Sequence, residues 1–195
     1  MFSLVVDDFG VQYYIGKEHA QHIYEVLNQK YQCTSDWEGK KYCGLNIEWN
    51  YEEGWVDIFI EGFAEKGLQR FKHCKPNKPQ DSPYPCAPIQ YGAKVQYAEE
   101  PDTSRPITID ETKLLQEIIG YFLYYGRAVD STLLAALGTL AAAQTEGMEE
   151  TMKAVTHFLN YVATHPDARV RFHKSDMILH GHSDGSHLSE QKSRS

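Results

Sequence analysis

The sequence has few cysteines and no long hydrophobic stretch. Its four cysteines show no Cys-x-x-Cys spacing and are too sparse for a secreted disulfide scaffold. No apolar run approaches the roughly 18–20 residues that a bilayer span requires, which excludes a transmembrane protein and a membrane partner. The first eight residues contain two acids and no basic n-region, unlike a signal peptide. We therefore expect an intracellular protein with reduced thiols, in the cytoplasm or the nucleus.

Basic residues are also scarce relative to acidic ones. The chain has 19 Lys and Arg against 27 Asp and Glu, which gives a formal net charge of −8. This balance argues against attraction of nucleic acid by the whole surface, although a local basic groove remains compatible with it. Hydrophobic residues make up 42% of the 195 residues and aromatic residues 12%, which is a globular composition for one domain or two small ones.

Prolines are absent from most of the chain and concentrated in one part of it. Seven of the eight lie within residues 73–108, which excludes a continuous helix or a central strand there. We interpret this segment as a linker that runs extended over a surface and separates two units. Before it, the periodicity predicts a hairpin over 2–15, a helix over 17–31, a second hairpin over 43–60 and a helix over 63–72.

The second unit is predicted to be mainly helical. Thr108 and Glu111 have the spacing of a capping box, and apolar residues follow at helical period. Two further helices are predicted over 132–144 and 148–162, and His165-Pro166 ends the last of them. Short strands are expected around 170–172 and from 177 onward. The fold class is therefore α+β, with a mixed first unit and a mainly helical second one.

Two adjacent carboxylates, Asp7 and Asp8, are the most distinctive chemical feature. They follow an apolar strand at a tight turn, where they repel each other unless they are solvated or bound to cations. Two divalent metal ions need carboxylates held in this way to align an attacking and a leaving oxygen. An ordinary solvated hairpin turn is the alternative, because aspartate favours turns.

The motifs around this pair resemble, in order, the polyproteins of copia-type long-terminal-repeat retrotransposons. Residues 2–11 resemble the palm motif of reverse transcriptases, in which a strand-turn-strand hairpin carries an aspartate pair. The next motifs are the start of the palm helix at Lys17-Glu18-His19-Ala20, the hairpin that grips the primer end at Asp36-Trp37-Glu38-Gly39 and Tyr42-Cys43-Gly44-Leu45-Asn46-Ile47-Glu48-Trp49, and the start of the thumb at Glu61-Gly62-Phe63-Ala64-Glu65-Lys66-Gly67-Leu68-Gln69-Arg70-Phe71.

The resemblance continues to the end of the chain. Residues 120–130 and 161–168 are similar to the connection region, and His182-Ser183-Asp184-Gly185-Ser186 resembles the opening strand of ribonuclease H. The resemblance implies four segments. They are the C-terminal palm and thumb (1–72), a proline-rich linker (73–108), a helical connection (109–168) and the truncated start of an RNase H-like domain (169–195).

The resemblance implies RNA-directed DNA polymerisation by two-metal nucleotidyl transfer. Its catalytic and metal-binding residues are Asp7, Asp8 and, in ribonuclease H, Asp184, with Mg²⁺ or Mn²⁺ as cofactor. Its partners are an RNA template, a DNA primer and deoxynucleoside triphosphates. The helix with Lys66, Arg70 and Lys72 is expected to contact duplex phosphates, or else to be a solvated face; these three are the nucleic-acid-binding candidates.

The sequence departs from the family pattern in three ways. Val5 stands where the palm motif usually has tyrosine, two places before the aspartate pair. The fingers and the front of the palm, with a further aspartate, are expected to be missing, and ribonuclease H stops after its first strand. We therefore expect a fragment that is inactive alone, in a cytoplasmic particle or the nucleus. The alternative is a non-enzymatic remnant that acts as a protein-interaction module.

Overall fold

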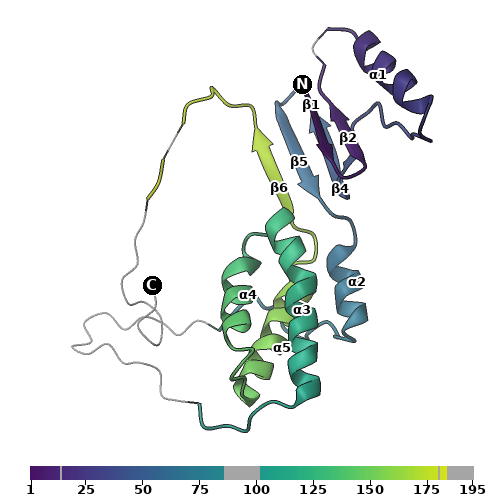
Figure 1. Ribbon diagram of the computed structural model, residues 1–195. Helices are drawn as coiled ribbons and strands as arrows, with labels where there is room; N and C mark the ends of the chain where they lie inside the picture. Colours follow the sequence, from purple (N-terminus) through teal and green to yellow (C-terminus); the bar gives the residue numbers. More distant parts are fainter. Residues whose placement is uncertain (14, 86–101, 180, 184–195) are drawn as a thin grey trace.

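A computed structural model describes residues 1–13, 15–85, 102–179 and 181–183 of the chain (Figure 1). Within these residues the fold is a mixed α+β arrangement of five helices and two antiparallel sheets, so the predicted class is confirmed at this level. None of the helices described is long and apolar enough to cross a bilayer. The elements in chain order are β1 (Phe2–Val5), β2 (Asp8–Val11), α1 (Glu18–Asn28), β3 (Lys41–Tyr42), β4 (Leu45–Asn50), β5 (Trp55–Phe59), α2 (Phe63–Arg70), α3 (Ile109–Ala128), α4 (Leu133–Ala142), α5 (Glu149–Thr164) and β6 (Arg169–His173).

The larger sheet has four strands in the order β3-β4-β5-β6, and each strand is antiparallel to its neighbour. Side chains alternate between the two faces of the sheet along each strand, which gives the faces different compositions. Ile47, Ile58 and Val170 are opposite one another in the register and share one face. Ile58 and Val170 pack against the helical core. The opposite face carries charged and aromatic side chains, which include the buried carboxylate of Asp57.

Strand β6 comes from the far end of the chain and completes this sheet beside β5. Phe59 is opposite Arg169, and the backbone N–H of Lys174 donates to Gly54 at 2.7 Å. Strands β3 to β5 of the first 72 residues therefore share one sheet with a strand from the segment expected to open a ribonuclease H domain. The further strand predicted from Met177 is wrong for residues 177–179, which form no strand.

The hydrophobic core joins α2 to the three helices that follow the proline-rich segment. Phe122 of α3 is fully buried, and its ring lies 6.2 Å from that of Phe71 and 5.5 Å from that of Phe158. Gly67 allows this close approach, because a Cβ atom there would lie 2.5 Å from the ring of Tyr121. The core therefore extends across the boundary expected at residues 73–108.

The described start of the proline-rich segment runs along α5. His157 and Thr164 of α5 hold it through hydrogen bonds with the Ser82 carbonyl and the Gln80 N–H, both at 3.0 Å. His165 also contacts Asp81, 3.2 Å from imidazole nitrogen to carboxylate oxygen. These contacts fix the path between α2 and the bundle up to residue 85.

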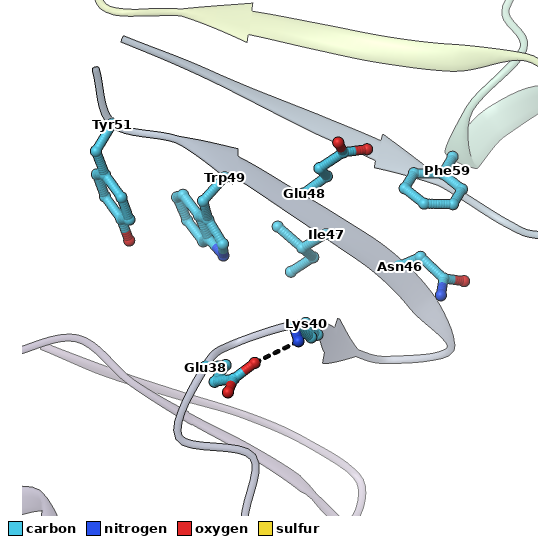
Figure 2. Close-up of a pocket in the computed structure, with 8 residues that line it drawn as sticks. All are labelled: Glu38, Lys40, Asn46, Ile47, Glu48, Trp49, Tyr51 and Phe59. Atoms are coloured by element: carbon cyan, nitrogen blue, oxygen red, sulfur yellow. Dashed lines mark ion pairs between the residues drawn. The ribbon is translucent and has the colours of Figure 1, made fainter. Parts of the chain in front are cut away.

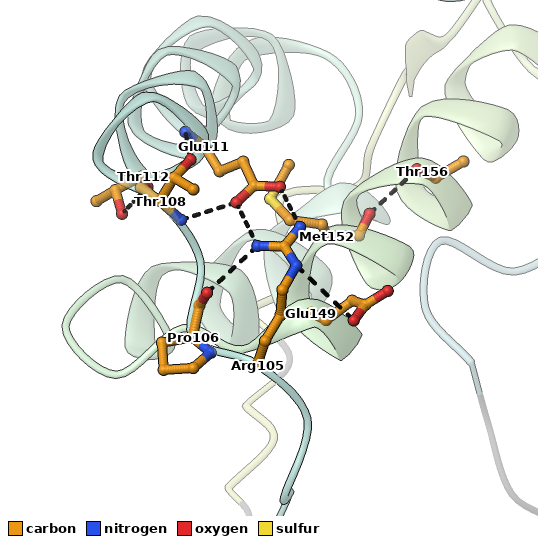
Figure 3. A network of polar contacts seen from close by, with 8 residues as sticks. All are labelled: Arg105, Pro106, Thr108, Glu111, Thr112, Glu149, Met152 and Thr156. Atoms are coloured by element: carbon orange, nitrogen blue, oxygen red, sulfur yellow. Dashed lines mark hydrogen bonds and ion pairs between the residues drawn. The ribbon is translucent and has the colours of Figure 1, made fainter.

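The predicted capping box at the start of α3 is confirmed (Figure 3). The Glu111 N–H donates to the Thr108 hydroxyl at 3.2 Å, and the Thr108 N–H donates to the Glu111 carboxylate at 2.7 Å. Arg105 donates two hydrogen bonds to the same carboxylate and lies 3.9 Å from Glu149 of α5. Together Arg105 and the Thr108 N–H lower the pKa of Glu111 to about 2. This network ties the start of α3 to the start of α5.

Candidate functional site

The aspartate pair lies at the tip of the hairpin formed by β1 and β2 (Figure 1). Val5 is opposite Asp8, so Val6 and Asp7 form a two-residue turn. Val6 has a φ of 56°, in the left-handed region that a β-branched residue rarely adopts. Backbone strain of this kind costs about 1–3 kcal/mol and is concentrated at functional sites in proteins. The turn thus holds Asp7 and Asp8 next to each other at an energetic cost.

One face of the hairpin contacts β3 of the larger sheet. The Ser3 hydroxyl and the Tyr42 hydroxyl are hydrogen-bonded at 2.6 Å. Gly10, opposite Ser3, leaves room for the Tyr42 ring, since a Cβ atom there would lie 3.2 Å from it. Because side chains alternate along a strand, Asp8 lies on this same face, two residues before Gly10.

The other face of the hairpin is apolar and exposed. Phe2 and Phe9 stack with their ring centroids 5.6 Å apart, and Leu4 lies opposite Phe9. Phe2 is 69% exposed and Leu4 is 61% exposed, which is unusual for neighbouring apolar side chains on one sheet face. A sheet face of this kind is normally covered by further protein.

The donor set at the tip suits a hard divalent cation but is incomplete. The side chains of Asp7 and Asp8 are both exposed, and their carboxylates make no hydrogen bond or ion pair within the described part of the chain. Two carboxylates, completed by water and substrate phosphates, are a usual set for Mg²⁺. Nowhere in the described ranges do three or more His, Cys, Asp or Glu side chains gather to hold a metal ion. The third metal-binding candidate, Asp184, lies outside the described residues.

The three basic candidates of the α2 segment differ in their surroundings. Arg70 forms an ion pair with Glu117 of α3 at 3.2 Å, which reduces its attraction for a phosphate. Lys66 and Lys72 are exposed and make no ion pair within the residues the structure describes. Lys72 has a φ of 53° and ends the helix in a Schellman motif, in which the His73 N–H donates to the Leu68 carbonyl. Glycine is the usual residue at that position.

The hairpin expected at the primer end is organised by Asp36. Its carboxylate accepts four backbone N–H groups, from Glu38 and Gly39 at 3.1 Å, Lys40 at 2.6 Å and Lys41 at 2.9 Å. Partial burial raises the pKa of Asp36, but these four donors outweigh it and hold the pKa below its usual value. Asp36 thereby fixes the loop beside β4.

A groove of about 450 Å³ lies between this loop and β4 (Figure 2). The Trp49 indole N–H donates to the Gly39 carbonyl at 2.9 Å. The rings of Trp49 and Tyr51 are parallel, with centroids 5.7 Å apart. Trp49 is 45% exposed.

Sequence reasoning also missed the pairing of Asp57 with Arg171. Arg171 donates from Nε and Nη2 to the two Asp57 oxygens, at 2.7 and 2.8 Å. The two residues are far apart in the sequence. The signal that the sequence offered was one acidic residue, Asp57, within a predicted strand.

No protein-family model, curated protein or solved structure matches the chain.

Proposed function

We propose that the chain is the C-terminal part of a reverse transcriptase palm, with the thumb and connection, of the copia-type retrotransposon class. The observation that carries this proposal is the hairpin turn, where a strained Val6 presents two adjacent carboxylates that have no protein partner in the described residues. The hydrogen bond between Ser3 and Tyr42, which joins this hairpin to the expected primer-end hairpin, also supports it.

In this proposal each group has a distinct task. Asp7 and Asp8 hold Mg²⁺ or Mn²⁺, and Lys66 and Lys72 bind phosphates of the template–primer duplex. The chemistry supplied by the bound ions is activation of the primer 3′-hydroxyl and stabilisation of the leaving pyrophosphate of a deoxynucleoside triphosphate. The hairpin provides two of the carboxylates, so the fragment requires the front of the palm for catalysis. A cytoplasmic particle or the nucleus is the corresponding location.

The metal assignment is tested with Mn²⁺ alone. We expect Mn²⁺ to broaden the amide NMR signals of residues 6–9 selectively, because a paramagnetic ion relaxes nearby nuclei. Asp7→Asn removes one of two charged ligands and should weaken Mn²⁺ affinity by about tenfold or more, since ligand charge governs the affinity of such sites. Asp110→Asn, an exposed acid on α3, is the matched control. Equal broadening in all three proteins would contradict the assignment.

The nucleic-acid assignment is tested at Lys72, where stability and binding should change in opposite directions. Lys72→Gly removes a side chain from a left-handed position and should stabilise the protein by about 0.5–1 kcal/mol. The affinity for an RNA–DNA hybrid duplex, measured by fluorescence anisotropy, should fall, and its salt slope should decrease by about one. Lys30→Gln, beyond the end of α1, should leave both unchanged. Unaltered duplex binding by Lys72→Gly would remove Lys72 from the interface.

A non-enzymatic interaction module is the second candidate, and the exposed apolar face of the first hairpin favours it. Phe2 and Leu4 present a surface that suits another protein better than solvent. This candidate predicts no selective Mn²⁺ effect at residues 6–9 and no salt-dependent binding of the hybrid duplex. The two experiments above therefore separate the two functions.

A further inference from the structure

The β1–β2 hairpin that carries Asp7 and Asp8 has few ties to the rest of the molecule. A two-stranded hairpin on its own is only marginally stable in water. Within the described residues, the hydrogen bond between the Ser3 and Tyr42 hydroxyls is the one hydrogen bond that joins β1 or β2 to another element. The placement of the two carboxylates relative to the larger sheet therefore depends on how Tyr42 is held and on how it fits the hairpin.

Tyr42 contacts the hairpin with its ring as well as with its hydroxyl. The hydroxyl oxygen lies 2.6 Å from Ser3 Oγ. The ring lies against Gly10, the residue opposite Ser3, where a Cβ atom would come within 3.2 Å both of the ring and of Ser3 Oγ. Glycine within a strand is typical of a place where another group approaches the backbone closely. Both contacts lie on the face of the hairpin that also carries Asp8.

Tyr42 is itself held in place at the end of the larger sheet. It belongs to the edge strand β3 and is opposite Leu45, across a two-residue turn. Both turn residues have a left-handed φ, 51° at Cys43 and 78° at Gly44, as in the turn type that suits the twist of a two-residue hairpin. The hydroxyl of Tyr124 in α3 donates to the Cys43 carbonyl at 3.4 Å. Tyr42 thus connects the β1–β2 hairpin, through this turn, to α3.

The position of the hairpin matters because Asp7 and Asp8 provide only part of a metal site. The turn at Val6 sets how the two carboxylates lie relative to each other. The remaining ligands of a divalent ion have to come from other groups, so the hairpin must be placed correctly relative to them. A functional site has to hold its groups within about 0.5 Å of the productive geometry. A contact that orients the whole hairpin can meet this requirement.

We propose that Tyr42 is a positioning residue for the carboxylates of Asp7 and Asp8. Its ring and hydroxyl fix the orientation of the β1–β2 hairpin on β3, and the turn at Cys43 couples that orientation to α3. Tyr42 should therefore determine where a bound ion lies relative to the larger sheet, and not how tightly the two carboxylates bind it. This inference rests on the proposed function, since it concerns the carboxylates that are proposed there to hold Mg²⁺ or Mn²⁺.

The test compares the wild-type protein with Tyr42→Phe, which removes only the hydroxyl, and uses Mn²⁺ alone. In the wild type, an ion at the hairpin tip should broaden the amide NMR signals of residues 6–9 and, more weakly, those of residues 41–46, because paramagnetic broadening falls steeply with distance. In Tyr42→Phe the broadening at 6–9 should persist, with a Mn²⁺ affinity within about twofold of the wild type. The broadening at 41–46 should fall, because the hairpin is no longer held against β3.

Gly10→Val removes the same contact from the hairpin side. Valine favours a strand, so β1 and β2 should stay paired while the new side chain takes the space of the Tyr42 ring. This variant should reproduce the fall in broadening at 41–46, and its combination with Tyr42→Phe should add little, because both changes break one contact. Tyr31→Phe, at an exposed tyrosine beyond the end of α1, is the matched control and should leave both broadening patterns unchanged.

This inference and the metal assignment fail in different ways. Absence of selective broadening at residues 6–9 in the wild type would contradict the metal assignment and this inference with it. Selective broadening at 6–9, together with equal broadening at 41–46 in the wild type and both variants, would overturn the role of Tyr42 alone. A loss of Mn²⁺ affinity of about tenfold in Tyr42→Phe would also overturn it. So would broadening at 41–46 that survives in Asp7→Asn, because the ion would then lie elsewhere.

Discussion

Phe122→Ala is expected to lower the free energy of unfolding by about 3–5 kcal/mol, the range for removal of a fully buried aromatic ring. The ring of Phe122 contacts Tyr121 in its own helix, Phe71 just after α2 and Phe158 in α5. Its loss leaves a cavity where these elements meet. Because one core includes residues on both sides of the proline-rich segment, α2 and the bundle should lose stability together in one transition.

Urea unfolding followed by far-ultraviolet circular dichroism and by tryptophan fluorescence measures the loss of stability and shows whether α2 and the bundle unfold together. All three tryptophans precede residue 73, so fluorescence reports on the first part of the chain. The two probes should give one coincident transition. Leu123→Ala, at the next position of α3 and 38% exposed, is the control and should cost less than about 1 kcal/mol. Separate transitions before and after residue 73 would show that the shared core does not couple the two parts.

The second large effect is expected at Arg171. Asp57 is 3% exposed, and Arg171→Ala removes both of its side-chain hydrogen bonds. A buried carboxylate without partners is costly, but the Arg171 side chain is 46% exposed, so water can replace part of the lost interaction once it is removed. Because the cost of the unpartnered carboxylate exceeds this compensation by water, we expect a loss of about 1–3 kcal/mol in the free energy of unfolding. Arg171→Lys should recover only part of it, since lysine lacks the paired donors.

The acid stability of the protein should report on the same pair. The hydrogen bond from Arg171 holds the pKa of Asp57 below its ordinary value of 3.8. A lowered folded-state pKa stabilises the protein above the unfolded-state pKa, and this stabilisation is lost as pH falls below 3.8 through the folded-state pKa. Arg171→Ala should therefore flatten the fall in stability below that pH. A fall as steep as in the wild type would mean that Asp57 does not contribute to it.

Arg169 provides the comparison for both measurements. It is the same residue type in the same strand with the same 46% side-chain exposure. Its closest carboxylate is the exposed Glu48, at 2.7 Å, and it lies 4.0 Å from Asp57. Exposed ion pairs contribute about 0–1 kcal/mol, so Arg169→Ala should be the milder change. Equal losses of stability for Arg169→Ala and Arg171→Ala would show that burial of the partner carboxylate does not determine the cost of removing the arginine.

Local patterns predicted the secondary structure well. Alternation of apolar residues identified the strands that became β4 and β5, and helical period identified the five helices in the described part of the chain. The capping box of Thr108 and Glu111 could be predicted because it depends on two residues three positions apart.

Long-range pairing could not be predicted. The five-residue strand β6 was expected to belong to a separate C-terminal segment, but it pairs with β5. A short strand carries no local signal for its partner, because register depends on which edge is free once the helices have packed. The position of Asp57 next to Arg171 follows from that register and could not be predicted either.

The candidate site was predicted in part. A tight turn at Asp7 and Asp8 follows from the sequence, but the left-handed Val6 does not, since valine is a poor residue for it. The basic character of α2 was visible, whereas the ion pair of Arg70 with Glu117 required knowledge of how α2 and α3 pack. Asp184 lies outside the described residues, and its role stays a prediction.

The position of β6 also determines when the molecule can finish folding. Residues 55–59 are synthesised more than a hundred positions before their partners at 169–173, so the ribosome releases β5 long before β6 exists. Closing so long a loop is slow in an unfolded chain, and prior folding of α3 to α5 shortens the distance to be searched. Until then the β5 edge with Asp57 is uncovered. The nascent chain therefore passes through a stage in which it is most exposed to mispairing and most dependent on chaperones.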